Sequence, residues 1–125
     1  MAALCPCGSG IGFAECCRPV LRGEREAATA EALMRSRYTA FVRRDEAYLL
    51  RTWAAQTRPA AVETDGVTWQ GLEIVGSTAG QPADASGTVT FVAHFSDGTS
   101  VQALREHSRF AREEGRWVYV DGDHQ

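Results

Sequence analysis

The chain has 125 residues, a formal net charge of -3 and a hydrophobic content of 44%. These values indicate one globular domain with at most a small appendage, and they exclude a strong electrostatic preference for nucleic acid or an anionic membrane. All 13 basic residues are arginines, which excludes catalysis through a lysine amine.

The chain shows no sign of a membrane span or of a secretory leader. No apolar run approaches the length of about 20 residues that a bilayer requires, and the N-terminus lacks a basic segment followed by an apolar one. We therefore expect a cytoplasmic protein. Thiols stay reduced in that compartment, so clustered cysteines favour metal binding over disulfides.

All four cysteines lie within residues 5–17, as the pairs Cys5-x-Cys7 and Cys16-Cys17. Four thiolates match a closed, tetrahedral structural zinc site, which leaves no open position for catalysis. Residues 8–10, Gly-Ser-Gly, let the backbone turn back toward the sulfurs. A segment this short cannot bury a core, so metal binding would supply its folding energy. The alternatives are a disulfide or redox site and an iron–sulfur cluster.

Two helices are predicted after this segment. Thr29 is placed to cap the first helix, with Glu31 in its first turn. Apolar side chains gather on one face of that helix at helical spacing: Leu33, Met34, Tyr38, Phe41 and Val42. Asp45 is expected to cap a second, shorter helix over residues 45–53, whose apolar side carries Leu49 and Trp53.

Strand patterns replace the helical ones in the second half of the chain. Strands are predicted over residues 66–76, 88–95, 100–112 and 116–122, with residues 77–87 as a loop. Asp97-Gly98 is a strong hairpin signal, and residues 113–115 form another turn. The order predicts an α+β fold, in which the helices pack on one face of a curved antiparallel sheet. Such a cone often keeps a pocket at its open end.

The periodicity places polar side chains inside this cone. Arg37 falls within the apolar face of the first helix, where an unpaired charge would be expensive to bury. Glu106 and Ser108 share the inward parity of Leu104 and Phe110 on their strand. We therefore expect Arg37 and Glu106 to meet, with Ser108 and Tyr38 nearby. The pair is either a structural ion pair or part of a small-molecule pocket with Glu106 as a general base. Candidate wall residues are Trp53, Trp69 and Trp117.

The remaining polar residues give weaker signals. His94, His107 and His124 are interpreted as surface residues, because none lies at zinc-ligand spacing from another. The arginines near the first helix leave only a small exposed basic set, so we do not expect nucleic-acid binding.

Several motifs together resemble the YchJ family of bacterial proteins: CPCGSG at residue 5, TAEALMRSRYTAFV at residue 29, YLLRTW at residue 48, Glu-x-Ser-x-Phe at residues 106–110 and RWVYVDG at residue 116. The resemblance implies a SEC-C zinc motif over residues 1–20, called the knuckle below. It also implies a cystatin-like, nuclear-transport-factor-2-like α+β domain over residues 28–125. It implies no reaction, and catalytic residues stay unknown.

The SEC-C resemblance also bears on partners. In the tail of the preprotein translocase motor, this motif docks to a chaperone and the ribosome. Such motifs commonly carry lysines between the cysteine pairs, but residues 8–15 hold no base and one acid, Glu15. This departure puts a transferred docking role in doubt. Ile11 and Phe13 offer the alternative that the knuckle docks onto the second domain of its own chain.

The leading functional hypothesis is a zinc-binding adaptor or small-ligand-binding module without catalysis. One alternative is an enzyme of unknown reaction that uses Arg37, Tyr38 and Glu106 in the cone. Another is a thiol redox sensor with labile zinc. The expected partners are a protein bound through the knuckle, a small molecule in the cone, and a second copy of the chain docked on the outer face of the sheet.

Overall fold

The computed structural model describes residues 3–125. Three helices precede four strands in chain order: α1 (Cys17–Leu21), α2 (Ala30–Val42), α3 (Glu46–Arg51), β1 (Thr68–Ala79), β2 (Ser86–Ser96), β3 (Val101–Glu113) and β4 (Arg116–His124). The predicted α+β class and the helix-then-strand order are confirmed.

Both predicted helix caps are formed. The Thr29 hydroxyl accepts a hydrogen bond from the Ala32 amide at 3.0 Å, and the Asp45 carboxylate accepts one from the Tyr48 amide at 3.1 Å. Each cap satisfies an amide that has no partner within its own helix. The caps fix where α2 and α3 begin, and therefore which side chains α2 turns toward the sheet.

The strands form one antiparallel meander in the order β1-β2-β3-β4. The Asp97-Gly98 turn joins β2 to β3, and its glycine adopts a φ of +97°. The predicted loop over residues 77–87 is too long, because β1 continues to Ala79 and β2 begins at Ser86. A β-carbon at Gly87 would clash with the backbone of Gly80, and one at Gly80 would clash with Ala30, so neither position has room for a side chain. This absence of side chains lets the hairpin remain paired almost to its tip.

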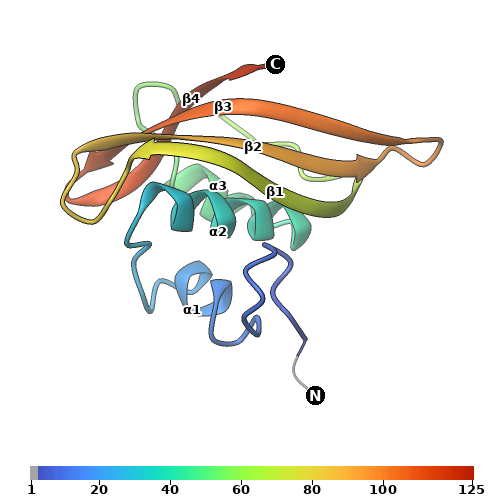
Figure 1. Cartoon of the computed structure of the whole chain (residues 1–125), viewed down its shortest axis with the longest axis horizontal. Helices are drawn as coiled ribbons and strands as arrows, with labels where there is room; N and C mark the ends of the chain where they lie inside the picture. Colours follow the sequence, from blue (N-terminus) through green and yellow to red (C-terminus); the bar gives the residue numbers. More distant parts are fainter. Residues whose placement is uncertain (1–2) are drawn as a thin grey trace.

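Helix α2 is buried on two sides. Figure 1 shows α2 between the sheet and the N-terminal segment that includes α1. One core cluster joins the side of α2 that carries Leu33 and Tyr38 to the sheet residues Val89, Phe91 and Phe110. A second cluster packs Ala40, Tyr48 and Leu49 against the cysteines of the knuckle. The knuckle therefore forms a third layer of the molecule.

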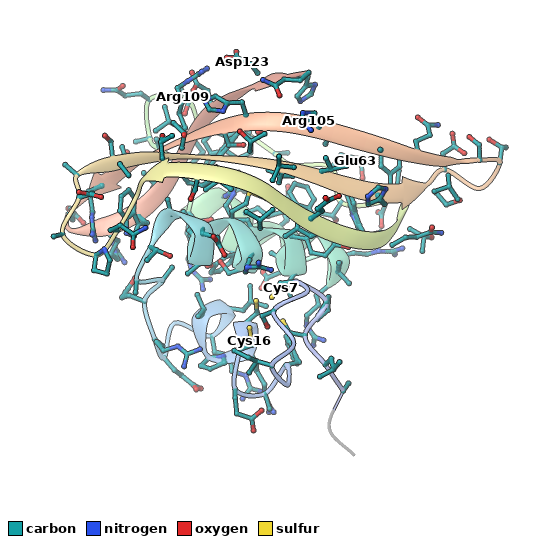
Figure 2. The ribbon with its side chains drawn as sticks, in the orientation of Figure 1. Cys7, Cys16, Glu63, Arg105, Arg109 and Asp123 are labelled. Atoms are coloured by element: carbon teal, nitrogen blue, oxygen red, sulfur yellow. The ribbon has the colours of Figure 1, made fainter. Side chains whose placement is uncertain are left out.

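The face of the sheet turned away from the helices is polar. Arg105, Arg109 and Asp123 project from this face in Figure 2. The Arg109 guanidinium donates to Asp121 at 2.5 Å and to Asp123 at 2.8 Å. Among the described residues, no helix is long and apolar enough to cross a membrane.

Candidate functional site

The four cysteine sulfurs form one cluster. Their Sγ atoms all lie within 4.8 Å of one another, and none of the four is in a disulfide. Cys5, Cys7 and Cys17 are buried, whereas Cys16 is partly exposed. Hydrogen bonding from the Cys17 thiol lowers the pKa of Cys7 to about 4, which favours one thiolate within the group. Four converging sulfurs of this kind could hold a metal ion.

Backbone geometry brings these sulfurs together. Gly8 and Gly10 adopt φ values of +81° and +82°, conformations that residues with a side chain rarely adopt. The loop they form places the Ser9 hydroxyl 3.1 Å from the Cys16 sulfur. The Cys5 amide donates to the Ile11 carbonyl at 2.8 Å and closes the loop.

The knuckle is fastened to α2 by polar contacts. Thr39, fully buried on α2, places its hydroxyl 3.3 Å from the Cys17 sulfur and 3.7 Å from the Cys5 sulfur. Arg35 donates to the Cys7 carbonyl at 2.6 Å and also pairs with Glu31. In Figure 2 the labelled Cys7 and Cys16 lie on the side of α2 opposite the sheet. The cysteine cluster is thus part of the folded body.

The two apolar knuckle residues differ in their surroundings. Phe13 packs against the second core cluster, and the Arg43 guanidinium lies 4.6 Å from the centroid of its ring. Ile11 is 51% exposed, and Leu4 nearby is 68% exposed. Docking onto the second domain, the alternative raised by the sequence, therefore involves Phe13 but leaves Ile11 outside.

A cavity of about 320 Å³ opens inside the cone on the other side of α2. Aromatic and aliphatic side chains from α2 and all four strands make most of its wall. Its lining includes three of the predicted pocket residues, Arg37, Tyr38 and Glu106, and two of the predicted wall residues, Trp53 and Trp69. Trp117, the third predicted wall residue, lies in the core, and its indole donates to the Ala28 carbonyl at 3.2 Å.

Arg37 is the buried cation of this cavity, with 3% of its surface exposed. Its Nη1 donates to the Leu49 carbonyl at 2.8 Å and to the Thr52 hydroxyl at 2.7 Å. The rings of Trp53 and Tyr119 lie 5.0 and 4.7 Å from its guanidinium carbon. Burial lowers the pKa of Arg37 to about 10, so the side chain remains protonated at neutral pH.

Glu106, also buried, is held by three side chains. Its Oε2 accepts hydrogen bonds from Ser108 at 2.5 Å and from Tyr119 at 3.0 Å. Its Oε1 lies 3.0 Å from Nε2 of His124, which is itself 70% exposed. Burial and the neighbouring Glu106 charge raise the pKa of Tyr119, so the phenol keeps the proton that it donates.

The expected contact between Arg37 and Glu106 is wrong. Both side chains face the cavity, yet no ion pair joins them among residues 3–125. The Tyr119 side chain takes the place of that contact, since its hydroxyl binds Glu106 and its ring covers Arg37. Within residues 3–125 the buried cation therefore has no direct ion pair, although the charge of the nearby Glu106 still raises its pKa.

An irregularity in the β3–β4 pairing determines what surrounds Glu106. Phe110 pairs with Tyr119, but Arg109 pairs with Asp121, so β4 carries one extra residue at this point. Regular pairing would have set Asp123 opposite Glu106. The extra residue instead sets His124 there and turns Asp121 and Asp123 outward to Arg109. His124 is 70% exposed, in agreement with its interpretation as a surface residue, and it also contacts Glu106.

A larger hollow of about 600 Å³ lies beside the cone. Its lining mixes both charge signs, with Arg25, Arg51, Arg58 and Arg116 near Glu26, Glu113 and Glu114. Of the predicted site residues, only Trp117 is found among the described residues that line this hollow. The mixed charges give it no clear preference for a cation or an anion.

Comparisons with known families agree with this two-part organisation. A family model described as "YchJ, middle NTF2-like domain" matches residues 29–122, and one described as "SEC-C motif" matches residues 1–19. A UPF0225 protein of Streptomyces avermitilis is 54% identical over 97% of this chain and 84% of its own length. A UPF0225 protein of Streptomyces coelicolor is 49% identical over 95% of this chain and 94% of its own.

Solved structures show the same fold. The solution structure of a SEC-C motif-containing protein from Rhodopseudomonas palustris has a TM-score of 0.84 and 34% identity, and covers 98% of both chains. The crystal structure of a SEC-C motif-containing protein from Psychrobacter arcticus has a TM-score of 0.79 and 26% identity. It covers 94% of this chain and 80% of that one.

Proposed function

The chain belongs to the YchJ-like family of SEC-C proteins, and from that premise we propose that it is a small-molecule receptor braced by a structural zinc site. One observation carries the proposal. The cone keeps a protonated arginine in an aromatic cavity, and no carboxylate of the described residues forms a direct ion pair with it. A buried charge without a partner is costly, and a ligand would supply the missing partner.

The donor set supports zinc as the metal. Thiolates are soft ligands that select zinc or iron–sulfur clusters, and zinc takes four of them in a tetrahedron at about 2.3 Å. Ligand atoms of such a tetrahedron lie about 3.8 Å apart. The Sγ atoms of Cys7 and Cys16 are 3.7 Å apart. When bound, the metal would supply stability to the knuckle; it would have no open position for a substrate.

The knuckle packs against α2, the same helix that carries Arg37. Thr39 meets the cysteine cluster on one side of α2, whereas Arg37 projects into the cone on the other. A metal-loaded knuckle would therefore hold α2 against the sheet and keep the cavity in shape.

The contacts of Glu106 favour binding over catalysis. A general base needs a free lone pair directed at the substrate. The Glu106 oxygens already accept from Ser108 and Tyr119, and they contact His124. These contacts occupy most of the roughly four lone-pair sites of the carboxylate, which supports a positioning role for Glu106, in which it holds the Tyr119 ring against Arg37.

A thermal-shift screen tests the receptor. Wild-type protein and Ala93→Leu are screened against one library of small acids, amines and neutral compounds. Ala93 lines the cavity and is 2% exposed, so the added methyl groups fill the ligand space while the fold is kept. We expect compounds that raise the Tm of the wild type but leave that of Ala93→Leu unchanged. A library without such a compound would contradict the receptor function.

Zinc content is tested separately. Native mass spectrometry of the purified chain is expected to show one zinc ion per chain, and Cys16→Ser is expected to lose it. A metal-free wild type that keeps its knuckle folded would contradict the zinc assignment, without bearing on the cavity.

A second candidate function, docking of a partner protein through the knuckle, is favoured by one observation. Leu4 and Ile11 present exposed apolar side chains on two segments that lie side by side, because Leu4 pairs with Gly12. A pull-down with wild type and the double variant Leu4→Ser, Ile11→Ser tests this. Loss of a specific partner in the variant supports docking, and identical captures contradict it.

A further inference from the structure

The two buried charged residues of the cone, Arg37 and Glu106, differ in how fully their polar atoms are hydrogen-bonded. Glu106 accepts two hydrogen bonds at Oε2, and its Oε1 lies 3.0 Å from Nε2 of His124. Arg37 uses only Nη1 for hydrogen bonds within the described chain, and both acceptors are neutral oxygens. The carboxylate of Glu106 is thus stabilised by several protein groups. The guanidinium of Arg37 still has N–H groups without an acceptor.

Resting on the proposed receptor function, we propose that the ligand is a small monocarboxylic acid with a flat apolar body, whose carboxylate lies against Arg37. Arginine presents its remaining N–H groups in a planar fork that matches a carboxylate. Among the described residues that line the cavity, Arg37 carries the only guanidinium, so it can bind one carboxylate. A dianion would leave its second charge near Glu106 and the apolar wall.

The unpaired polar atoms of the wall point to the same ligand chemistry. Among the described residues, two buried side-chain nitrogen or oxygen atoms lack a hydrogen-bond partner, Nε1 of Trp53 and Nε1 of Trp69. Both are N–H donors, and both side chains line this cavity. Both nitrogens have almost no accessible surface, so a ligand would reach them only after the indole rings turn. An acid could then accept hydrogen bonds from these donors, whereas a protonated amine could not.

The remaining wall sets the shape of the ligand. Trp69 is surrounded by the rings of Tyr38, Phe41 and Phe95, whose centroids lie 5.6 to 5.9 Å from its own. Flat rings offer broad apolar faces to a flat ligand. The cavity of about 320 Å³ lies near the lower end of ligand-binding pockets. It fits a body of about ten to fifteen non-hydrogen atoms at the packing density of protein interiors.

Three molecules of equal size and different charge test the assignment. Cinnamate, cinnamamide and cinnamylamine share one flat body and differ only in the terminal group. Their affinities are measured by calorimetry at pH 7.5, with wild type, Arg37→Met and the control Arg43→Met. Arg43 is exposed and follows the same helix, so its replacement removes the same charge without touching the cavity.

We expect wild type and Arg43→Met to bind cinnamate about 10- to 100-fold more tightly than cinnamamide, as is usual when a hydrogen bond to a charged group is lost. Arg37→Met is expected to lose this preference and bind the two alike. Equal or tighter binding of the amide or the amine by the wild type overturns the acid assignment but leaves the receptor standing. If none of the three binds, the ligand class is overturned; the receptor itself fails only if the Ala93→Leu screen also finds no ligand.

Discussion

Replacing Arg37 with methionine should leave the stability of the protein nearly unchanged while it abolishes the preference for an anion. Burial lowers the pKa of Arg37 from 12.5 to about 10, which corresponds to a cost of about 3 kcal/mol for the protonated side chain in the folded state. This cost is present in full below pH 10 and is relieved as the pH rises from there toward 12.5, because only the unfolded chain still holds the proton.

Methionine has a similar length and carries no charge. The substitution gives up two hydrogen bonds from a charged group, to Leu49 and Thr52, a loss of about 3 kcal/mol in all at about 1.5 kcal/mol each. This loss nearly cancels the relief of the burial cost, so the free energy of unfolding should stay within about 1 kcal/mol of the wild type. For a chain of 125 residues, the usual unfolding entropy converts this margin into a Tm change of at most about 4 °C.

Urea unfolding at pH 7.5 in the presence of zinc measures this change. Arg22→Met is the matched control, since Arg22 is exposed beside the knuckle, and it should leave the free energy of unfolding unchanged within about 0.5 kcal/mol. A free energy of unfolding that falls by more than about 2 kcal/mol in Arg37→Met would contradict this expectation. In that case Arg37 would mainly stabilise the fold, and its charge would not be available to bind a ligand.

Three further predictions address the knuckle, the Glu106 network and pH. Thr39→Val removes the hydroxyl that contacts the cysteine sulfurs and is expected to lower zinc affinity about 10- to 100-fold in a chelator competition; unchanged affinity would show that Thr39 only fills space. Gly122→Ala places a β-carbon against the Glu106 carboxylate and should lower the free energy of unfolding by about 1 to 3 kcal/mol. Gly76→Ala, with open space around it, should be neutral, and equal effects of the two would exclude the steric explanation. Cinnamate affinity should stay constant between pH 7 and 9 and fall above pH 10, because the pKa of Arg37 is about 10 and only the protonated form attracts the carboxylate; a fall that begins near pH 8 would point to another group.

The local rules of the sequence predicted much of this architecture. Helix caps depend on neighbouring residues, so Thr29 and Asp45 could be identified without the fold. Strand parity is equally local, and it correctly turned Glu106 and Ser108 inward together with Phe110. These features could be predicted because each depends on a few consecutive residues.

The arrangement of the candidate site depends on contacts between residues that are far apart in the sequence, and local sequence patterns do not predict such contacts. The extra residue in β4 moved His124 and Gly122 opposite the inward residues of β3, and no turn residue signals that position. Trp53 reaches Arg37 because its segment pairs with β4 at Tyr119. One feature of the sequence indicated that α2 has a second buried side. Three residues of the helix, Ser36, Thr39 and Ala40, have short side chains, which leave room for the knuckle to approach.

The most direct test of the cone as a ligand site follows the three indole N–H signals in a proton–nitrogen correlation spectrum during a titration with cinnamate. If cinnamate binds in the cone, the signals of Trp53 and Trp69 should shift, because both rings line the cavity and their N–H groups have no partner among the described residues. The signal of Trp117, which is bonded to Ala28, should stay in place. Saturating cinnamate that leaves Trp53 and Trp69 unmoved, or that shifts Trp117 alone, would contradict it.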